Sequence, residues 1–581
     1  MRNSRFSSGL LAAAFVLTTL APISSRAQSA APTMDEALAA IAAYAPRALA
    51  EQGAPGMSVA ITDRTHTLRI ITAGYANLDT KAPVTPDTRF PIGSISKSMT
   101  TLLLLQMHDR GLIDLQAPVT TYLPWWRIQG ARKPILIHQL LSHTAGIPDD
   151  YTFVSSYGFA VAALRDAHEI FQPGTAWAYS NDGFATIGAV VAAVGKAPWQ
   201  EQLASGVFAP IGMAHSSAYF TPRDMEDTAT GYEVRDIDRP QLDHPALIAA
   251  QNYDFVDPAG SVISTPADMA AYMRLYLNGG KTADGHTLIS HASFLAMTNA
   301  DHLANGKPAG AAGIEMAEWP SFYKQYGYGL SIFHKDGDHL IGHTGGVSGY
   351  TACMQANLTR GFGAIAMANL VESPLHPCAI VKYAMAVLRA QQLGQALPAA
   401  PAPPPSPNIV PDPAQYAGTY TATDGSTIAF AADGRELTTS LHGATYPVFP
   451  QSDDTFATHD PRLRMFYTAF HRDKQRQVYG FNNGSKLYYK AGYAGPRSFS
   501  HPASWNALVG RYEAVIWGQP IIVRTIIVGD RLTFDGISPL RPQKDGSFLS
   551  GTSRVRFDTP AAGQMQRLWI DGGDLYRIDL P

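Results

Sequence analysis

The sequence is poor in cysteine and in charged residues, and both shortages exclude classes of protein. Only Cys353 and Cys378 occur among 581 residues, too few for a disulfide-rich scaffold or a cysteine-based zinc module. Charged residues make up 16% of the chain, and 44 basic side chains nearly balance 47 acidic ones. Apolar residues make up 46%, so we expect a folded protein. Because the charges nearly balance, we expect no nucleic-acid partner. The spacing of the two cysteines leaves a disulfide open.

Long apolar runs are also missing beyond the N-terminus, so no transmembrane span is expected in the mature chain. The first residues contain Arg2 and Arg5, an apolar run over residues 9–20 and the small-residue pattern Ser25-Arg26-Ala27. This arrangement is typical of a signal peptide, residues 1–27, cleaved after Ala27. An uncleaved membrane anchor is the alternative, but the apolar run is too short to span a bilayer. We therefore expect a periplasmic or secreted protein.

A proline-rich segment divides the remaining chain. Residues 398–413 contain eight prolines at close spacing, which predicts an extended linker. Before it, residues 28–397 mix helical and strand patterns. After it, the sequence alternates in short strands and repeats, since Gln415–Tyr420 resembles Ala507–Tyr512.

The repeat predicts two small antiparallel β-barrels of lipocalin-like form, residues 414–500 and 501–581. A single sheet built from two halves is the alternative. The sequence gives no function for these barrels and leaves the oligomeric state open.

The region before the linker predicts an α+β domain in which helices pack against an antiparallel sheet, with a helical lobe inserted at about residues 100–250. The expected elements are helices over Met34–Glu51, Ser96–His108 and Ala379–Gln391, a hairpin over Met57–Gly74, and successive strands over Tyr328–Phe333, His339–His343, Tyr350–Ala356 and Ala364–Leu370.

The start of the Ser96 helix carries a reactive pattern, Ser94-Ile95-Ser96-Lys97. Residues three apart share a helix face, so the Lys97 amine is expected beside the Ser94 hydroxyl. A desolvated lysine is able to take the proton of a serine, and the helix N-terminus offers N–H groups to an oxyanion. The pattern alone is weak, because Ser321–Lys324 also fits it and Ser94 is a common kind of helix cap.

Two further motifs follow in order: Tyr179-Ser180-Asn181, and His343-Thr344-Gly345-Gly346 on a late strand. With these, the sequence resembles the serine β-lactamase and penicillin-binding protein superfamily, in its branch of class C β-lactamases, DD-carboxypeptidases, D-aminopeptidases and esterases. The resemblance extends over about residues 40–390 and includes Ile137–Pro148. It implies a β-lactamase-like fold.

The resemblance also implies roles for the residues of the three motifs. Ser94 would be the acylated nucleophile, Lys97 its partner in proton transfer, and Tyr179 the group that protonates the leaving group and activates the deacylating water. A phenol beside ammonium groups is driven towards the phenolate, which suits that role.

Substrate binding falls to the other motif residues. Asn181 would orient Lys97 and bind a substrate amide, while His343 and Thr344 would line the substrate-side strand. The backbone N–H groups of Ser94 and Gly346 would form the oxyanion hole.

No cofactor and no metal are expected. His138 and His143 lie five residues apart without an evident third ligand, so a metal pair is a poor interpretation. His343 stands where class C β-lactamases have a lysine, and a short, mostly neutral histidine provides no fixed cation. Loops at residues 151–157 and 227–254 would select the acyl side chain.

The sequence therefore predicts an exported serine hydrolase that works through an acyl-enzyme on Ser94. Its substrate would be a small peptide, ester or β-lactam, with short or D-amino-acid-containing peptides preferred, as in DD-carboxypeptidases and D-aminopeptidases. A carboxylesterase with incidental β-lactam hydrolysis is the alternative within this mechanism. A non-catalytic penicillin- or peptidoglycan-binding protein is the alternative from another class.

Overall fold

The computed structural model describes most of the chain beyond the N-terminal segment. The described residues are 31–148, 156–236, 239–240, 245–250, 257–310, 324–371, 377–402, 408–516, 519–551, 553–570 and 573–579. The signal peptide, most of the 151–157 loop, part of the 227–254 loop and Ser321 lie outside them. Every helix in the described ranges is too short or too polar to cross a bilayer.

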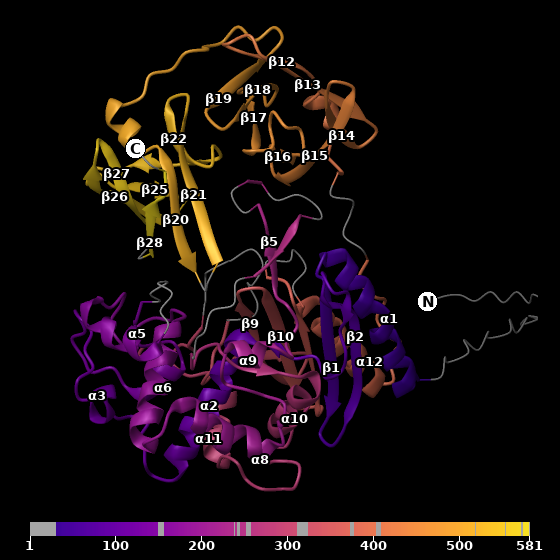
Figure 1. Cartoon of the computed structure of the whole chain (residues 1–581), viewed down its shortest axis with the longest axis vertical. Coiled ribbons are helices and arrows are strands. Elements are labelled where there is room, and N and C mark those ends of the chain that lie inside the picture. Colours follow the sequence, from indigo (N-terminus) through magenta and orange to yellow (C-terminus); the bar gives the residue numbers. More distant parts are fainter. Residues whose placement is uncertain are drawn as a thin grey trace, which may run out of the picture.

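A seven-stranded antiparallel sheet in the order β3-β2-β1-β11-β10-β9-β8 forms the centre of the first domain (Figure 1). Its strands are β1 (Gly56–Asp63), β2 (Thr67–Asn77), β3 (Ala82–Pro83), β8 (Ser331–Lys335), β9 (Asp338–Val347), β10 (Tyr350–Asn357) and β11 (Phe362–Ala368). The early hairpin joins the late strands through the pairing of β1 with β11. Strand β8 begins three residues later than predicted, because Gly329 adopts a left-handed turn conformation with φ of 68°.

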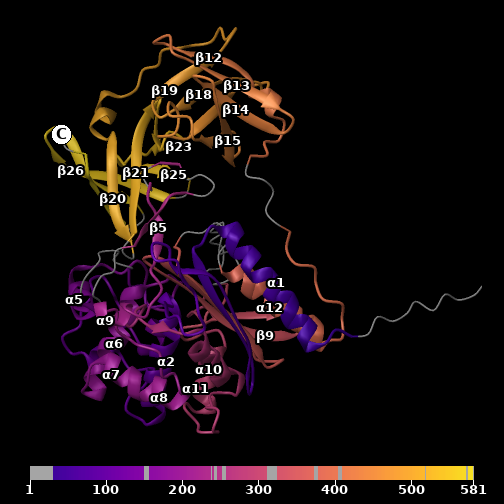
Figure 2. The ribbon, with the colours of Figure 1, turned by 45° about the vertical axis from the view of Figure 1, so that its right-hand side comes forward.

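Helices cover both faces of the sheet, which confirms the predicted α+β class (Figure 2). Helices α1 and α12 pack on one face, and α10 with the helical lobe covers the other. The helices are α1 (Met34–Gln52), α2 (Ser96–Asp109), α3 (Val119–Tyr122), α4 (Ile137–Leu141), α5 (Tyr157–Ala163), α6 (Asn181–Gly195), α7 (Trp199–Leu203), α8 (Ala209–Ile211), α9 (Pro222–Met225), α10 (Pro266–Leu277), α11 (His291–Thr298) and α12 (Cys378–Gln392).

Helix α2 runs through the middle of the helical lobe. Eleven of its fourteen residues are buried, including the run Leu102–Leu105. Because α2 is buried on nearly every side, close packing makes it a rigid base for its N-terminus.

Two short two-stranded sheets complete this domain. β4 (Phe90–Pro91) pairs with β7 (Ile263–Ser264), just before the Ser94 turn. β5 (Tyr232–Val234) pairs with β6 (Leu247–Ala249) and extends from the helical lobe towards the C-terminal half (Figure 1).

The C-terminal half consists of two barrels, as predicted. The first is closed, with strands β12 (Gly418–Ala422), β13 (Thr427–Asp433), β14 (Glu436–Leu441), β15 (Ala444–Ser452), β16 (Thr455–Thr458), β17 (Thr468–Arg472), β18 (Val478–Asn483) and β19 (Lys486–Lys490). The second is a nearly closed nine-stranded sheet of β20 (Gly510–Ile516), β21 (Gln519–Val528), β22 (Arg531–Phe534), β23 (Ser538–Pro539), β24 (Arg541–Pro542), β25 (Phe548–Ser550), β26 (Ser553–Ala561), β27 (Gln564–Ile570) and β28 (Gly573–Arg577).

The sequence repeat has a structural counterpart at the start of each barrel. The Tyr420 hydroxyl donates to the backbone oxygen four residues earlier, Tyr416 O, at 2.8 Å. The Tyr512 hydroxyl does the same to Leu508 O at 3.1 Å. Both tyrosines are fully buried, so each ring anchors the first strand of its barrel over a core.

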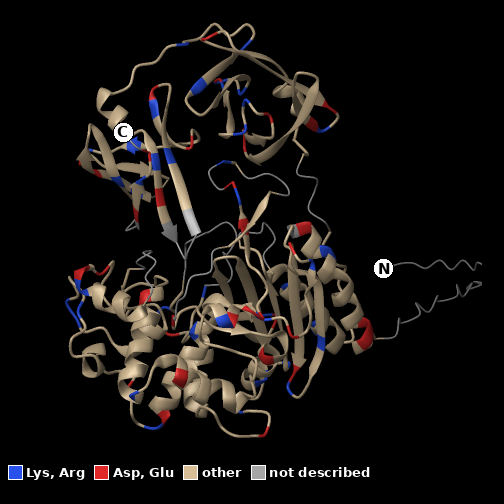
Figure 3. Ribbon diagram, viewed as in Figure 1, with Lys and Arg blue, Asp and Glu red and all other residues tan. Residues whose placement is uncertain are grey.

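The barrels meet the first domain at a cavity of about 90 Å³ near the β5–β6 hairpin. Its lining comes from three parts of the chain, namely Arg239 and Pro240, then Phe466 and Tyr467, then Ile522, Arg524 and Asp535. Figure 3 shows acidic and basic residues interspersed over both halves. Basic and acidic residues are therefore mixed within each half of the molecule.

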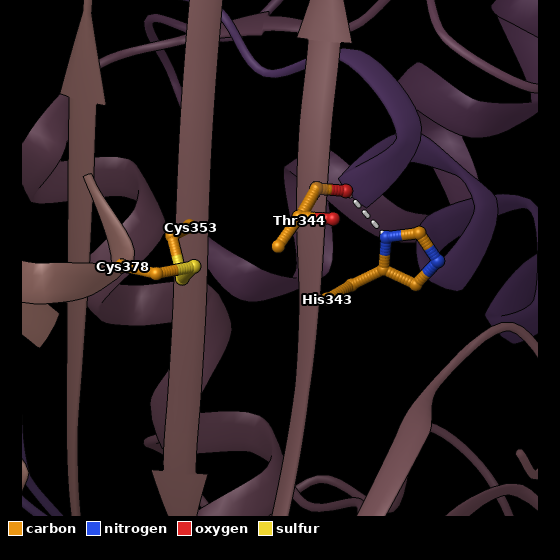
Figure 4. Close-up of a disulfide and its surroundings, with 4 residues drawn as sticks. All are labelled: His343, Thr344, Cys353 and Cys378. Carbon is orange, nitrogen blue, oxygen red and sulfur yellow. Dashed lines mark hydrogen bonds between the residues drawn. A yellow bond between two sulfur atoms is a disulfide. The ribbon is translucent and has the colours of Figure 1, made fainter. Parts of the chain in front are cut away.

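Cys353 and Cys378 form a disulfide, which the sequence had left open (Figure 4). It joins β10 to the first residue of α12, with 5.1 Å between the two Cα atoms, and both cysteines are buried. The bond therefore ties the closing helix to the central sheet.

Replacing both cysteines by alanine is expected to lower the free energy of unfolding of the first domain. With a sequence separation of 25, the chain-entropy model gives about 3.5 kcal/mol. Urea unfolding followed by tryptophan fluorescence measures the change, with the dithiothreitol-reduced wild type as the matched control. An unchanged midpoint in both would show that the bond contributes nothing to stability.

Candidate active site

Ser94 lies in a single 3-10 turn, Gly93–Ile95, that leads directly into α2. Its side chain is partly exposed, whereas its neighbours Gly93 and Ile95 are buried. Gly93 has φ of 51°, and a Cβ there would lie 2.6 Å from the Gly346 nitrogen. Only glycine therefore lets this turn approach β9 so closely.

Lys97 is fully buried, and its amine contacts oxygen atoms from three separate segments of the described chain. Its Nζ lies 3.1 Å from Ser94 Oγ, 2.6 Å from Asn181 Oδ1 and 3.0 Å from Ala259 O. The last two are pure acceptors and each takes an N–H, and the contact at 3.1 Å directs the amine to Ser94 Oγ as well. A proton between these two atoms is able to sit on either Ser94 Oγ or Lys97 Nζ. A neutral lysine in this position is able to act as the base that activates the serine.

Tyr179 and Asn181 flank the start of α6. The side chain of Ser180 caps this helix by accepting the Gly183 N–H at 3.0 Å. The cap fixes the chain so that Asn181 reaches Lys97 while the Tyr179 ring faces it, with Lys97 Nζ 4.7 Å from the ring centroid. Four predicted site residues from two helices and one turn thus lie together.

His343 and Thr344 lie on opposite faces of β9. Thr344 is paired with Cys353, whose sulfur points to α12, so the Thr344 side chain is on the α12 face. His343 is on the face of the helical lobe, where its ring centroid lies 6.3 Å from that of Tyr179. Figure 4 shows the two neighbours. The structure therefore brings the His343 side chain to the Lys97 cluster and places the Thr344 side chain on the other face of the strand.

Tyr326 is a site residue that the sequence did not reveal. Its hydroxyl donates to His343 Nε2 at 2.8 Å, and His343 Nδ1 donates to Thr344 O at 2.5 Å. Burial, followed by the charge of Lys97, lowers the pKa of His343 to about 3. The ring is therefore neutral at ordinary pH and offers no positive charge to a substrate. Tyr326 belongs to no motif, so only the fold could identify it.

Beside Ser94, one edge of β9 has no paired strand among the described residues. Strand β8 pairs with β9 only as far as Gly342 within the described residues. Beyond that point β9 approaches the Ser94 turn, since a Cβ on Gly345 would lie 1.8 Å from Ile92 O and 3.2 Å from Ser94 N. Gly346 is partly exposed with open space around its Cα. Gly346 therefore lies beside the Ser94 turn, and the oxyanion hole expected from the N–H groups of Ser94 and Gly346 stays a prediction.

The two histidines considered as a metal pair have separate partners. His138 Nδ1 lies 3.0 Å from Asp301 Oδ2, and His143 Nδ1 accepts the Ser180 N–H at 3.1 Å. No cluster of three or more His, Cys, Asp or Glu side chains suited to a metal occurs in the part of the chain that the structure describes.

This fold and site agree with a family model. The model described as Beta-lactamase matches residues 37–382. The chain belongs to the beta-lactamase family. Among its curated relatives in that family, penicillin-binding protein 4 of Amycolatopsis lactamdurans is 26% identical over 369 residues, covering 62% of this chain and 91% of the relative. Penicillin-binding protein 4* of Bacillus subtilis is 24% identical over 407 residues, covering 66% and 83%.

Solved structures of beta-lactamase family relatives share the fold. The octameric penicillin-binding protein homologue from Pyrococcus abyssi has a TM-score of 0.52 at 23% identity, covering 78% of this chain and all of the homologue. The D-amino acid amidase of Ochrobactrum anthropi SV3 has a TM-score of 0.50 at 24% identity, covering 61% and 99%. The chain is thus a β-lactamase-like serine hydrolase by family, and its substrate is a separate question.

Proposed function

We propose that this protein hydrolyses short or D-amino-acid-containing peptides through an acyl-enzyme on Ser94, and that it does so after export to the periplasm or the medium. The observation that carries the proposal is the buried Lys97 amine, aimed at Ser94 Oγ at 3.1 Å and held by two other acceptors. A buried amine beside a serine hydroxyl points to function, because burying an amine is costly and groups with perturbed protonation gather at functional sites.

In acylation, the Ser94 proton passes to Lys97 Nζ while Oγ attacks the acyl carbon. The carbonyl electrons move onto oxygen, which the N–H groups of Ser94 and Gly346 bind. The C–N bond then breaks, and the leaving amine takes its proton through Tyr179. In deacylation, a water molecule gives a proton to Tyr179, its oxygen attacks the ester carbon, and Ser94 Oγ leaves with that proton.

The choice of peptides rests on His343 and its surroundings. A neutral imidazole that already accepts from Tyr326 provides no cation for the carboxylate of a β-lactam. The D-amino acid amidase, solved with L-phenylalanine amide, supports the inclusion of amide substrates, and the relatives named penicillin-binding protein 4 support acylation by a β-lactam as a probe of Ser94. A carboxylesterase would use the same Ser94 and Lys97 pair on an ester. A non-catalytic binding protein would have no turnover.

Labelling with a fluorescent penicillin and a fluorophosphonate tests the acyl-enzyme. Wild type is expected to be labelled and Ser94→Ala is not, and the opposite result for either protein contradicts the proposal. A panel of D-aminoacyl nitroanilides, D-Ala-D-Ala peptides, p-nitrophenyl esters and nitrocefin then tests the substrate class. Hydrolysis of esters without cleavage of any peptide would favour the carboxylesterase, and labelling without turnover would favour the binding protein.

A further inference from the structure

His143 has an unusual place beside the Lys97 cluster. It follows the short helix α4 and has a left-handed backbone with φ of 59°, which is uncommon for a residue other than glycine. It is only 2% exposed, although histidine is polar. Such a conformation persists only where the surroundings hold it, and such sites often have a functional reason.

The backbone N–H groups of the two residues on either side of Tyr179 hold His143. The Ala178 N–H donates to the His143 carbonyl oxygen at 3.0 Å, and the Ser180 N–H donates to His143 Nδ1 at 3.1 Å. The His143 ring also packs on the Tyr179 ring, with 4.4 Å between centroids. One residue therefore holds Tyr179 by its backbone on both sides and by its ring.

We propose that His143 is a positioning residue, which sets the Tyr179 hydroxyl for proton transfer by clamping the chain at Ala178 and Ser180. This inference rests on the proposed function, since it acts through Tyr179. The clamp needs a neutral ring, because a protonated Nδ1 cannot accept the Ser180 N–H.

The charges around the ring favour that neutral state. Burial, followed by the charge of Lys97 from α2, holds the pKa of His143 well below its usual value, and His343 from β9 faces the ring as a neutral imidazole. Within the described residues the other rings that face it are those of Tyr179, Phe184, Trp177 and Tyr326, and burial is the largest cause of the lowered pKa. The proton consequently sits on Nε2, which has no hydrogen-bond partner among the described groups.

Two substitutions separate the clamp from the bulk of the ring. In His143→Asn the amide oxygen takes the place of Nδ1, no Nε2 bond is lost, and asparagine tolerates a left-handed backbone. In His143→Gly the backbone is also unstrained, but the acceptor is gone. We expect His143→Asn to keep kcat within about tenfold of wild type. We expect His143→Gly to lose about 10²-fold in kcat with little change in KM, because a small displacement of a proton-transfer group costs about that much.

His138→Asn is the matched control. His138 lies in α4 and contacts Asp301, and it makes neither of the contacts that hold the Tyr179 segment. The kcat of His138→Asn should therefore stay near that of wild type. Equal kcat for His143→Gly and wild type, or an equal loss in the Asn and Gly variants, would overturn the role of His143. End-point fluorophosphonate labelling is measured beside the kinetics. If wild type is not labelled, the proposed function itself is contradicted. If the variants are labelled and their kcat is unchanged, only the role of His143 is contradicted.

A measurement on wild type covers the case in which His143→Gly does not fold. Nitrogen-15 NMR of the histidine rings is expected to show one ring with an unprotonated Nδ1 that does not titrate from about pH 5 to pH 8, while an exposed histidine titrates near 6.5. His143→Asn, which is expected to fold, assigns the signal by removing it. A His143 ring that takes up a proton in this interval contradicts the clamp.

Discussion

Replacing Lys97 by methionine is expected to lower kcat by about 10⁴-fold or more, because the loss of one member of a unit formed by a nucleophile and its base is nearly as severe as the loss of the whole unit. Methionine fills most of the volume of the lysine chain, so the fully buried site is not emptied. It offers no N–H to Asn181 or to Ala259 O, and no basic atom to Ser94 Oγ. Steady-state hydrolysis of whichever substrate the panel identifies measures the effect.

The control for this variant comes from the second Ser-x-x-Lys pattern of the chain. Lys324→Met removes the lysine of that pattern, and Lys324 is exposed. Its kcat should therefore match wild type. If Lys97→Met retained more than about one hundredth of the wild-type kcat, Lys97 would not be the base, since general base catalysis alone contributes about 10²-fold to 10⁴-fold. Tyr179 would then have to take the Ser94 proton directly.

Local patterns predicted the elements that carry the site. The three-residue spacing of Ser94 and Lys97 on a helical turn is enough to place the two side chains on one face, and their reacting atoms lie 3.1 Å apart. Alternating and repeating segments likewise indicated the sheet and both barrels, because a strand with one buried face shows its period directly in the sequence. The roles of the site residues came from the family resemblance and stay predictions.

Contacts between distant segments could not be derived from such patterns. Asn181 lies 84 residues from Lys97, and the Tyr326 contact to His343 joins a loop to a strand without any motif. The disulfide needed the packing of α12 on β10, which no spacing gives. For His143, within Ile137–Pro148, the sequence allowed only the rejection of a metal pair, because its carbonyl and ring partners at Ala178 and Ser180 are visible only in the fold.

Two adjacent glycines of β9 are expected to respond very differently to alanine. A Cβ on Gly345 would lie 1.8 Å from Ile92 O, so Gly345→Ala forces β9 away from the Ser94 turn. A Cβ on Gly346 meets no atom within 4 Å, so Gly346→Ala leaves the strand in place. Displacing one donor of an oxyanion hole costs about 10²-fold to 10³-fold in kcat, and we expect Gly345→Ala to lose at least that much.

The same pair of variants distinguishes a damaged oxyanion hole from a damaged fold. Gly346→Ala adds a methyl group where the substrate would pass, so it should raise KM for bulky acyl groups while kcat for small ones stays within about tenfold. Gly345→Ala should lose kcat for every substrate and also label slowly with fluorophosphonate, since acylation itself needs the hole. Near-UV circular dichroism checks that its domain is folded. Equal kinetics for the two folded variants would mean that the contact between β9 and the Ser94 turn does not serve the oxyanion.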